Sequence, residues 1–177
     1  MNTYPPAEPA SAPRALVACL GNVLCGDDGF GSVVANVLSL EGVPDDVRVL
    51  DVGIGGMGMV HDLAEPCEVL VVVDALDLGR LPGTVVVIAP DVDEQTDHPL
   101  WARHAELSSA HHTVPERALR VARAVGAPPA QAWLVGCQPA NTDRLAVGLT
   151  PQVEQAVAVA ATEVHRLIEG APARSTA

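Results

Sequence analysis

Aromatic and basic residues are scarce in this 177-residue sequence. Only 2% of the residues are aromatic, so stacking platforms for nucleic-acid bases or sugars are nearly excluded. Lys and Arg number 10 and Asp and Glu number 22, which gives a formal net charge of −12. A chain with this charge repels nucleic-acid phosphates and anionic membrane surfaces, so we expect neither as a partner.

The sequence also lacks a long apolar run, a secretory signal and closely paired cysteines. No apolar stretch approaches the roughly 20 residues that span a bilayer, and the first residues lack the basic start and apolar stretch of a signal peptide. The four cysteines form no Cys-x-x-Cys pair, which is typical of buried thiols in a reducing compartment. We therefore expect a cytoplasmic protein.

An apolar fraction of 49%, almost all of it aliphatic, is enough for one packed core in a chain of this length. Both ends are rich in Pro, Ala and Ser, which is typical of loose tails. The sequence predicts a flexible tail at 1–13, one α/β domain at 14–170 and a second flexible tail at 171–177.

Short apolar runs alternate with helical stripes along this domain. Strands are predicted at 15–20, 47–52, 68–74, 84–89 and 132–137, and helices at 30–40, 57–64, 114–125 and from Pro151 to about 168. This order predicts a single-domain three-layer α/β/α sandwich with about five strands, mostly parallel and twisted, with one antiparallel strand. The strands at 68–74 and 84–89 are joined so closely that we expect them to form an antiparallel hairpin. Thr150 and Pro151 are typical of a helix N-cap and first residue.

The first strand is followed by the glycine-rich segment GNVLCGDDGFG, residues 21–31. It contains neither G-x-G-x-x-G nor the lysine of a P-loop, and Asp27 and Asp28 stand where a phosphate would bind. Two carboxylates at this place suit a cation. Alternatively, they only interact with the positive end of the following helix dipole.

A second glycine-rich loop, between Gly53 and Gly58, suggests a backbone that a ligand approaches closely. Asp62 follows on a predicted helix and could join Asp28, although a solvated aspartate on the helix surface is an alternative. His111 and His112 precede a later helix and are candidate metal ligands or acid–base groups. Two carboxylates and one imidazole from three loops would make a divalent metal site with open positions.

These segments together resemble the hydrogenase maturation endopeptidases, which trim the large subunit of nickel–iron hydrogenases. The family begins with a strand and G-N-x-L-x-x-D-[DE]-x-x-G, continues with a D-x-G strand end and a helix bearing an aspartate, and later carries S-x-H and G-[LV]-[ST]-P. The matching positions are 21–31, Asp51 with Gly53 and Asp62, 109–111, and 148–151. The similarity spans about residues 14–169.

The resemblance implies that Asp28, Asp62 and His111 bind nickel, and that the nickel arrives already inserted in a hydrogenase large-subunit precursor. The family then removes a short C-terminal peptide from this precursor. The metal could polarise the scissile carbonyl or activate water, or it could only dock the substrate while Asp28 or Asp27 acts as general base. We favour docking, with Asp28 and Asp62 as the catalytic carboxylates. The S-x-H spacing favours His111 over His112.

Two other interpretations stay open. A non-cleaving, metal-dependent chaperone of the hydrogenase large subunit would use the same residues. A nucleotide-binding module is disfavoured by the paired aspartates.

The sequence departs from the family pattern in two places. The family often carries glutamate where this chain has the shorter Asp28, and the segment 91–108 matches no family motif. We expect a monomer.

Overall fold

The computed structural model describes residues 12–53, 66–89, 129–142 and 145–171. In chain order, these ranges contain β1 (Ala15–Leu20), the 3-10 turn η1 (Gly26–Gly29), α1 (Phe30–Glu41), β2 (Val47–Gly53), β3 (Val69–Ala75), β4 (Val85–Ile88), β5 (Gln131–Cys137) and α5 (Pro151–Glu169). Every predicted strand is confirmed, with bounds that differ by at most one residue. The helices predicted at 57–64 and 114–125 lie outside the described residues, as do most of the two predicted tails.

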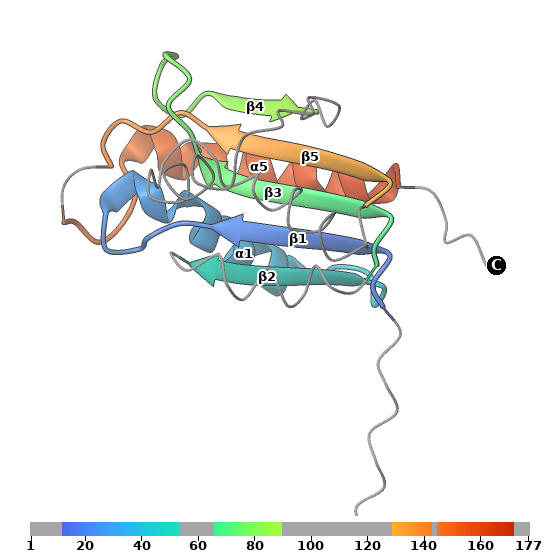
Figure 1. Ribbon diagram of the computed structural model, residues 1–177. Helices are drawn as coiled ribbons and strands as arrows, with labels where there is room; N and C mark the ends of the chain where they lie inside the picture. The colour runs from blue at the N-terminus through green and yellow to red at the C-terminus, as the bar shows by residue number, and fades with distance from the viewer. Residues whose placement is uncertain (1–11, 54–65, 90–128, 143–144, 172–177) are drawn as a thin grey trace, which may run out of the picture.

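The strands form one sheet in the order β2-β1-β3-β5-β4 (Figure 1). The pairs β1–β2, β1–β3 and β3–β5 are parallel, and β4 lies antiparallel to β5 at the edge. The predicted α/β class, with a mostly parallel sheet and one antiparallel strand, is therefore confirmed. The interior strand β1, between β2 and β3, is buried along its whole length, as expected for the continuous apolar sequence ALVACL in a strand that is covered on both faces.

The predicted hairpin between the third and fourth strands is wrong. β5 lies between β3 and β4, so the two strands do not pair. The connection 76–84 is long enough to pass the end of β5, and Gln138 holds it there. The Oε1 atom of Gln138 accepts hydrogen bonds from the backbone N–H groups of Leu78 (2.7 Å) and Arg80 (3.1 Å). Its carbonyl accepts one from Gly83 (2.9 Å). These bonds stabilise a crossing that the short, turn-like sequence of the connection does not predict.

Helices α1 and α5 cover the same face of the sheet (Figure 1). Alternate residues of β1 separate the two faces: Val17 and Cys19 pack with the helices, whereas Leu16 and Ala18 belong to an apolar cluster on the opposite face. The first turn of α1 lies directly on the sheet, because a Cβ atom on Gly31 would overlap the carbonyl oxygen of Leu20. This contact places the N-terminus of α1 at the carboxyl-terminal edge of β1.

The long helix α5 begins where the sequence predicts it. Thr150 is the N-cap in extended conformation and Pro151 is the first helical residue. The helix buries one face against the sheet; its buried residues are Val153, Ala156, Val157, Ala160, Ala161, Val164, Leu167 and Ile168. The opposite face is exposed. In the part of the chain that the structure describes, no helix combines the length and the apolar character that a bilayer crossing requires.

Candidate functional site

The candidate site lies at the carboxyl-terminal edge of the sheet, where the parallel strands β2, β1, β3 and β5 all end. Open α/β sheets bind their ligands at this edge. Here Asp27 and Asp28 lie in η1, directly after the loop that follows β1. Asp74 lies near the end of β3, and Asp51 near the end of β2. Four carboxylates therefore meet the same edge from three neighbouring segments.

Asp27 is completely buried and works as an anchor between distant segments. Its Oδ2 accepts hydrogen bonds from the N–H groups of Ala140 (2.8 Å) and Asn141 (3.2 Å) and from the hydroxyl of Thr150 (3.0 Å). Its Oδ1 accepts one from the N–H of Thr150 (2.6 Å). We call these four residues the Asp27 anchor. Because both oxygens are used and no solvent reaches them, Asp27 is not placed to act on a substrate, and the sequence alternative that it serves as general base is not supported.

The anchor also explains why Thr150 does not cap α5 with its side chain. The hydroxyl makes no capping hydrogen bond, because it donates to Asp27 instead. The N-terminus of α5 is thereby joined to η1, more than a hundred positions away in the sequence. The sequence analysis offered two roles for Asp27, interaction with the helix dipole and cation binding. The structure shows a different role, the joining of distant segments by hydrogen bonds.

Asp28 is held by its backbone and leaves its side chain available. Its N–H donates to the carbonyl of Cys25 (3.3 Å), and its carbonyl accepts from the N–H of Asn22 (3.1 Å). The loop closes so tightly here that a Cβ atom on Gly21 would overlap the carbonyl oxygen of Asp28. Asp28 is half-buried, and among the described residues no side-chain hydrogen bond engages its carboxylate. The backbone of Asp28 is therefore fixed, and its carboxylate makes no side-chain hydrogen bond within the described ranges.

Asp74 is the partner of Asp28 in this site. Burial raises the pKa of Asp74 to about 7; the hydrogen bond from the N–H of Ala75 (2.8 Å) opposes this rise, and the negative charge of Asp28 adds to it. A carboxyl group with this pKa exchanges a proton near neutral pH. We call Asp28 and Asp74 the acidic pair. Two carboxylates that repel each other in a partly buried place bind a cation favourably, because the cation removes the repulsion.

The sequence analysis did not single out Asp74, which it placed as the last residue of the third strand. A signal for it was present: the run VLVVVD is apolar up to its final carboxylate, and that carboxylate falls at the edge where α/β sheets carry their sites. Two features of the tertiary structure bring Asp74 near Asp28, and the sequence does not reveal either of them. β3 lies beside β1 in the sheet, and the loop after β1 folds back on itself through the hydrogen bond from the Asn22 N–H to the Asp28 carbonyl.

The other predicted site residues, Asp62, His111 and His112, lie outside the described residues. Their joining Asp28 stays a prediction. Within the described ranges, no three His, Cys, Asp or Glu side chains come close enough together to hold a metal ion. The acidic pair can supply two oxygen ligands, so a complete metal site requires donors from the remaining chain or from a substrate.

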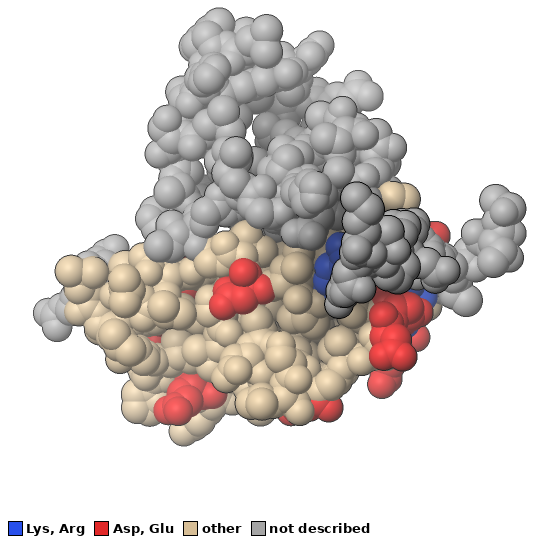
Figure 2. All heavy atoms as spheres, turned by 90° about the horizontal axis from the view of Figure 1, so that it is seen from below, with Lys and Arg blue, Asp and Glu red and all other residues tan. Residues whose placement is uncertain are grey.

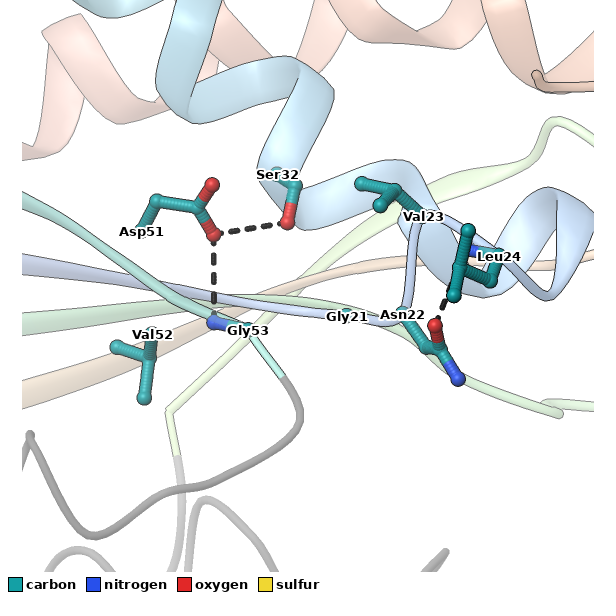
Figure 3. Close-up of a pocket in the computed structure, with 8 residues that line it drawn as sticks. All are labelled: Gly21, Asn22, Val23, Leu24, Ser32, Asp51, Val52 and Gly53. Carbon is teal, nitrogen blue, oxygen red and sulfur yellow. Dashed lines mark hydrogen bonds between the residues drawn. The ribbon is translucent and has the colours of Figure 1, made fainter. Parts of the chain in front are cut away.

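A pocket opens beside the acidic pair, between the ends of β1 and β2 (Figure 3). It has a volume of about 320 Å³. The residues that line it are Gly21, Asn22, Val23, Leu24, Ser32, Asp51, Val52 and Gly53. Asn22, whose N–H also donates to the Asp28 carbonyl, belongs to this lining, so the pocket and Asp28 share one loop.

The charge on the described surface is predominantly negative. Figure 2 shows separate acidic patches on the face seen from the β2 edge, where few basic side chains are visible. The whole chain has a formal net charge of −12. Such a surface attracts cationic partners and disfavours anionic ones.

Comparison with known proteins gives consistent matches. Residues 33–167 match a family model described as HycI, hydrogenase maturation protease. The hydrogenase expression/formation protein HupD of Rhodobacter capsulatus is 35% identical over 163 residues, which cover 89% of this chain and 74% of the relative. The hydrogenase maturating endopeptidase HybD of E. coli has a similar structure, with a TM-score of 0.71 and 28% identity over 88% of this chain and 92% of that one. A hydrogenase 2 maturation peptidase of a Thaumarchaeota archaeon has a TM-score of 0.64 and 30% identity over 88% and 97% of the respective chains.

Proposed function

The chain belongs to the hydrogenase maturation protease family and is an endopeptidase, and we propose that it removes the C-terminal extension of a nickel-loaded large-subunit precursor of a nickel–iron hydrogenase. The observation that carries this proposal is the acidic pair. Asp28 and Asp74 place two carboxylates at the ligand-binding edge of the sheet, close enough for one to raise the pKa of the other. Such a pair suits a client that brings its own cation.

The nickel belongs to the substrate in this proposal. Carboxylate oxygens and imidazole nitrogens are suitable ligands for divalent nickel, and we propose Asp28, Asp74, Asp62 and His111 as the candidate donors of this chain. Docking of the cation lowers the pKa of neighbouring carboxyl groups, because an opposite charge favours their ionised form. Asp74 therefore releases its proton as the precursor binds, and docking is expected to tighten as the pH rises through about 7.

The peptide bond is then hydrolysed by water with a carboxylate as general base. Asp28 is our first choice, because its backbone is held at both N–H and carbonyl and no described residue makes a side-chain hydrogen bond to its carboxylate. It takes a proton from the attacking water as the water oxygen bonds to the carbonyl carbon, and it passes this proton to the departing amine as the C–N bond breaks. Asp62 is the second catalytic candidate from the sequence.

The test is to incubate the protein with a nickel-loaded large-subunit precursor and, in parallel, with the nickel-free precursor, and to measure the mass of each product. We expect a loss of mass only in the nickel-loaded sample. Asp28→Asn is expected to slow the reaction by about 100-fold or more, whereas Asp45→Asn, at the opposite end of β2, removes one exposed charge and serves as the control. Equal cleavage of both precursors would contradict the role of nickel.

The same processing assay, applied to variants of the other candidate site residues, shows which of them the cleavage requires. Loss of processing in Asp74→Asn but not in Asp62→Asn would assign the second carboxylate to β3, and the reverse would assign it to Asp62. Loss in His111→Ala, with normal processing in His112→Ala, would confirm the S-x-H register. An unchanged precursor mass together with a stable complex would identify a non-cleaving chaperone instead.

The metal content of the purified protein separates two mechanisms. If the nickel comes with the substrate, the protein is expected to contain little metal after purification. One zinc ion per chain that resists chelators would instead indicate an ordinary metalloprotease. We propose that the protein acts in the cytoplasm as a monomer, which cell fractionation and sedimentation equilibrium check.

A further inference from the structure

Resting on the proposed function, we infer that residues 145–147 form an open strand edge on which an extended C-terminal segment of the precursor lies as an added strand. These residues belong to the connection between β5 and α5 and are paired with the loop that leads into η1, where Asp28 lies. Backbone hydrogen bonds hold the added segment, and aliphatic side chains of this chain contact it. The edge is a surface for peptide binding beside the proposed cleavage site.

The loops that follow β1 and β5 are joined as a short two-stranded ladder, and Figure 1 shows them side by side at one end of the sheet. Ala146 forms a parallel bridge with Cys25. Its carbonyl accepts a hydrogen bond from the N–H of Gly26 (2.7 Å), and its N–H donates to the carbonyl of Leu24 (3.0 Å). The Asp27 anchor also joins these two loops. The backbone of 145–147 is therefore held in place outside the main sheet.

The outer edge of this ladder is open. The N–H and C=O groups of successive strand residues point to opposite sides, so those of Leu145 and Val147 point away from the loop that Ala146 pairs with. Within the described ranges, no backbone hydrogen bond engages Leu145 or Val147. Unpaired N–H and C=O groups along an edge are the groups that an added strand uses.

Three aliphatic side chains on one face of the ladder are exposed. Side chains alternate along a strand, which puts Leu145 and Val147 on the face opposite to Ala146. Leu24 lies on the same face, because its neighbour Cys25 is the bridge partner of Ala146. Leu24, Leu145 and Val147 are 55%, 88% and 86% exposed. Large apolar side chains that gather on the surface indicate an interaction site. Together with the open backbone, they suit an extended peptide with apolar side chains.

The C-terminal segment of the precursor is the occupant that fits this edge. Gly26, which pairs with Ala146, precedes Asp28 by two positions. An added strand lies two strand spacings, about 10 Å, from the loop that carries Asp28. Three or four extended residues of the same chain span this distance. The edge therefore binds precursor residues a few positions away from the scissile bond.

A second copy of this chain is the other occupant that an open edge could pair with. Two copies that each carry a formal net charge of −12 repel each other, which favours a peptide over a dimer. The ladder itself contains only uncharged residues at 21–26 and 145–148, so it places no charge against an apolar peptide.

A peptide titration tests the edge without proteolysis. The full-length protein, labelled with nitrogen-15, is titrated with acetyl-Ser-Val-Ser-Val-Ser amide. We expect the amide signals of Leu145 and Val147 to shift, and the analogue with Ala in place of both Val residues to bind about fivefold more weakly because it buries less apolar surface. No shift at these amides would overturn the inference. A shift with protein concentration alone, together with a dimer in sedimentation equilibrium, would identify a second copy as the occupant and would also overturn it.

Two N-methylated peptides distinguish strand pairing from simple apolar contact. One carries methyl groups on its Val nitrogens and the other on its second and third Ser nitrogens. The N–H groups of alternate residues point to the same side of a strand, so one peptide loses its donors toward the edge and the other keeps them. We expect one of the two to bind at least about tenfold more weakly than the other. Equal affinities would contradict strand addition.

Side-chain variants test the aliphatic face. Leu145→Ser and Val147→Ser change exposed side chains and should leave the fold intact, while each weakens binding of the peptide about threefold to fivefold. Leu40→Ser is the matched control, because Leu40 is 79% exposed near the end of α1 and does not belong to the ladder. Equal binding by Val147→Ser and Leu40→Ser would contradict the assignment of this face.

The variant that combines Leu145→Ser and Val147→Ser then enters the processing assay. It should raise KM for the precursor about tenfold and leave kcat within about twofold, because the edge binds the precursor away from the reacting atoms. An unchanged KM would overturn the role of the edge in binding the precursor. Absence of cleavage by the unmodified protein would instead contradict the proposed function, and the peptide titration would then decide for or against the edge by itself.

Discussion

Asp27 and Asp28 are neighbours in one loop, yet the regions around them differ in almost every physical respect. The Asp27 anchor is closed to solvent, and both carboxylate oxygens accept hydrogen bonds from segments that follow β5. Asp28 is half-buried, and its charge adds to the raised pKa of another acid, Asp74. The difference shows that a carboxylate stabilises the fold where N–H groups converge on it, and becomes available for chemistry where they do not.

The largest effect on stability is expected from Asp27→Asn. The amide group cannot accept all the hydrogen bonds of the carboxylate, and its NH₂ would face the N–H groups of Ala140, Asn141 or Thr150. Unsatisfied buried donors should lower the free energy of unfolding by about 3 kcal/mol or more. Urea denaturation followed by circular dichroism measures this change. A loss below about 1 kcal/mol would show that the anchor contributes little.

Asp74→Asn should raise the free energy of unfolding, in contrast to Asp27→Asn, which lowers it. Burial raises the pKa of Asp74 from 3.8 to about 7, so the folded protein binds this proton more tightly than the unfolded chain. The resulting stabilisation is complete below pH 3.8 and is lost as the pH rises through about 7. Since Asn cannot ionise, the variant should be more stable than the unmodified protein by about 2–4 kcal/mol at pH 8. Thermal unfolding with chelator, at pH 8 and below pH 4, checks that the difference disappears in acid.

A smaller loss is expected from Thr150→Val, which removes one donor to Asp27 and keeps the shape of the side chain. The free energy of unfolding should fall by about 1–2 kcal/mol. Thr162→Val is the matched control, because Thr162 is exposed on the same helix and its hydroxyl donates to the Ala158 carbonyl (2.8 Å) and not to Asp27. Equal losses in the two variants would mean that the hydroxyl of Thr150 adds nothing to the anchor.

The smallest effect on stability belongs to Asp28→Asn. Its backbone hydrogen bonds do not involve the side chain, so unfolding should change by no more than about 0.5 kcal/mol. Relief of the repulsion with Asp74 should also lower the pKa of that residue. Two-dimensional NMR of the carboxyl carbons measures this pKa. A large loss of stability in Asp28→Asn would remove the distinction between the two regions.

Some of the candidate site was predictable from the sequence because its signals are local. GNVLCGDDGFG marks a loop with two acids at a helix start, and α1 begins at Phe30 as predicted, whereas the turn η1 that carries the two acids was not predicted. This pattern could not predict that Asp27 stabilises the fold whereas Asp28 is available to a ligand. The partners of Asp27 lie more than a hundred residues away, and no local periodicity reports a contact at that separation.

The pairing of Asp28 with Asp74 was missed for the same reason. Each residue is visible in the sequence, but their proximity follows from the neighbouring positions of β1 and β3 in the sheet. The predicted hairpin failed likewise, since the short linker favoured a local pairing whereas hydrogen bonds to Gln138 stabilise the passage across β5.

The sequence by itself determined the α/β class, the bounds of the described strands and the resemblance to hydrogenase maturation endopeptidases. These depend on apolar runs, helix-start residues and short motifs, which are read within one segment at a time. Only the tertiary structure decided the order of the strands, the burial of Asp27, the pairing of Asp28 with Asp74 and the pocket at Asp51. Those properties arise where distant segments meet, because desolvation and hydrogen bonding depend on what surrounds a side chain in space.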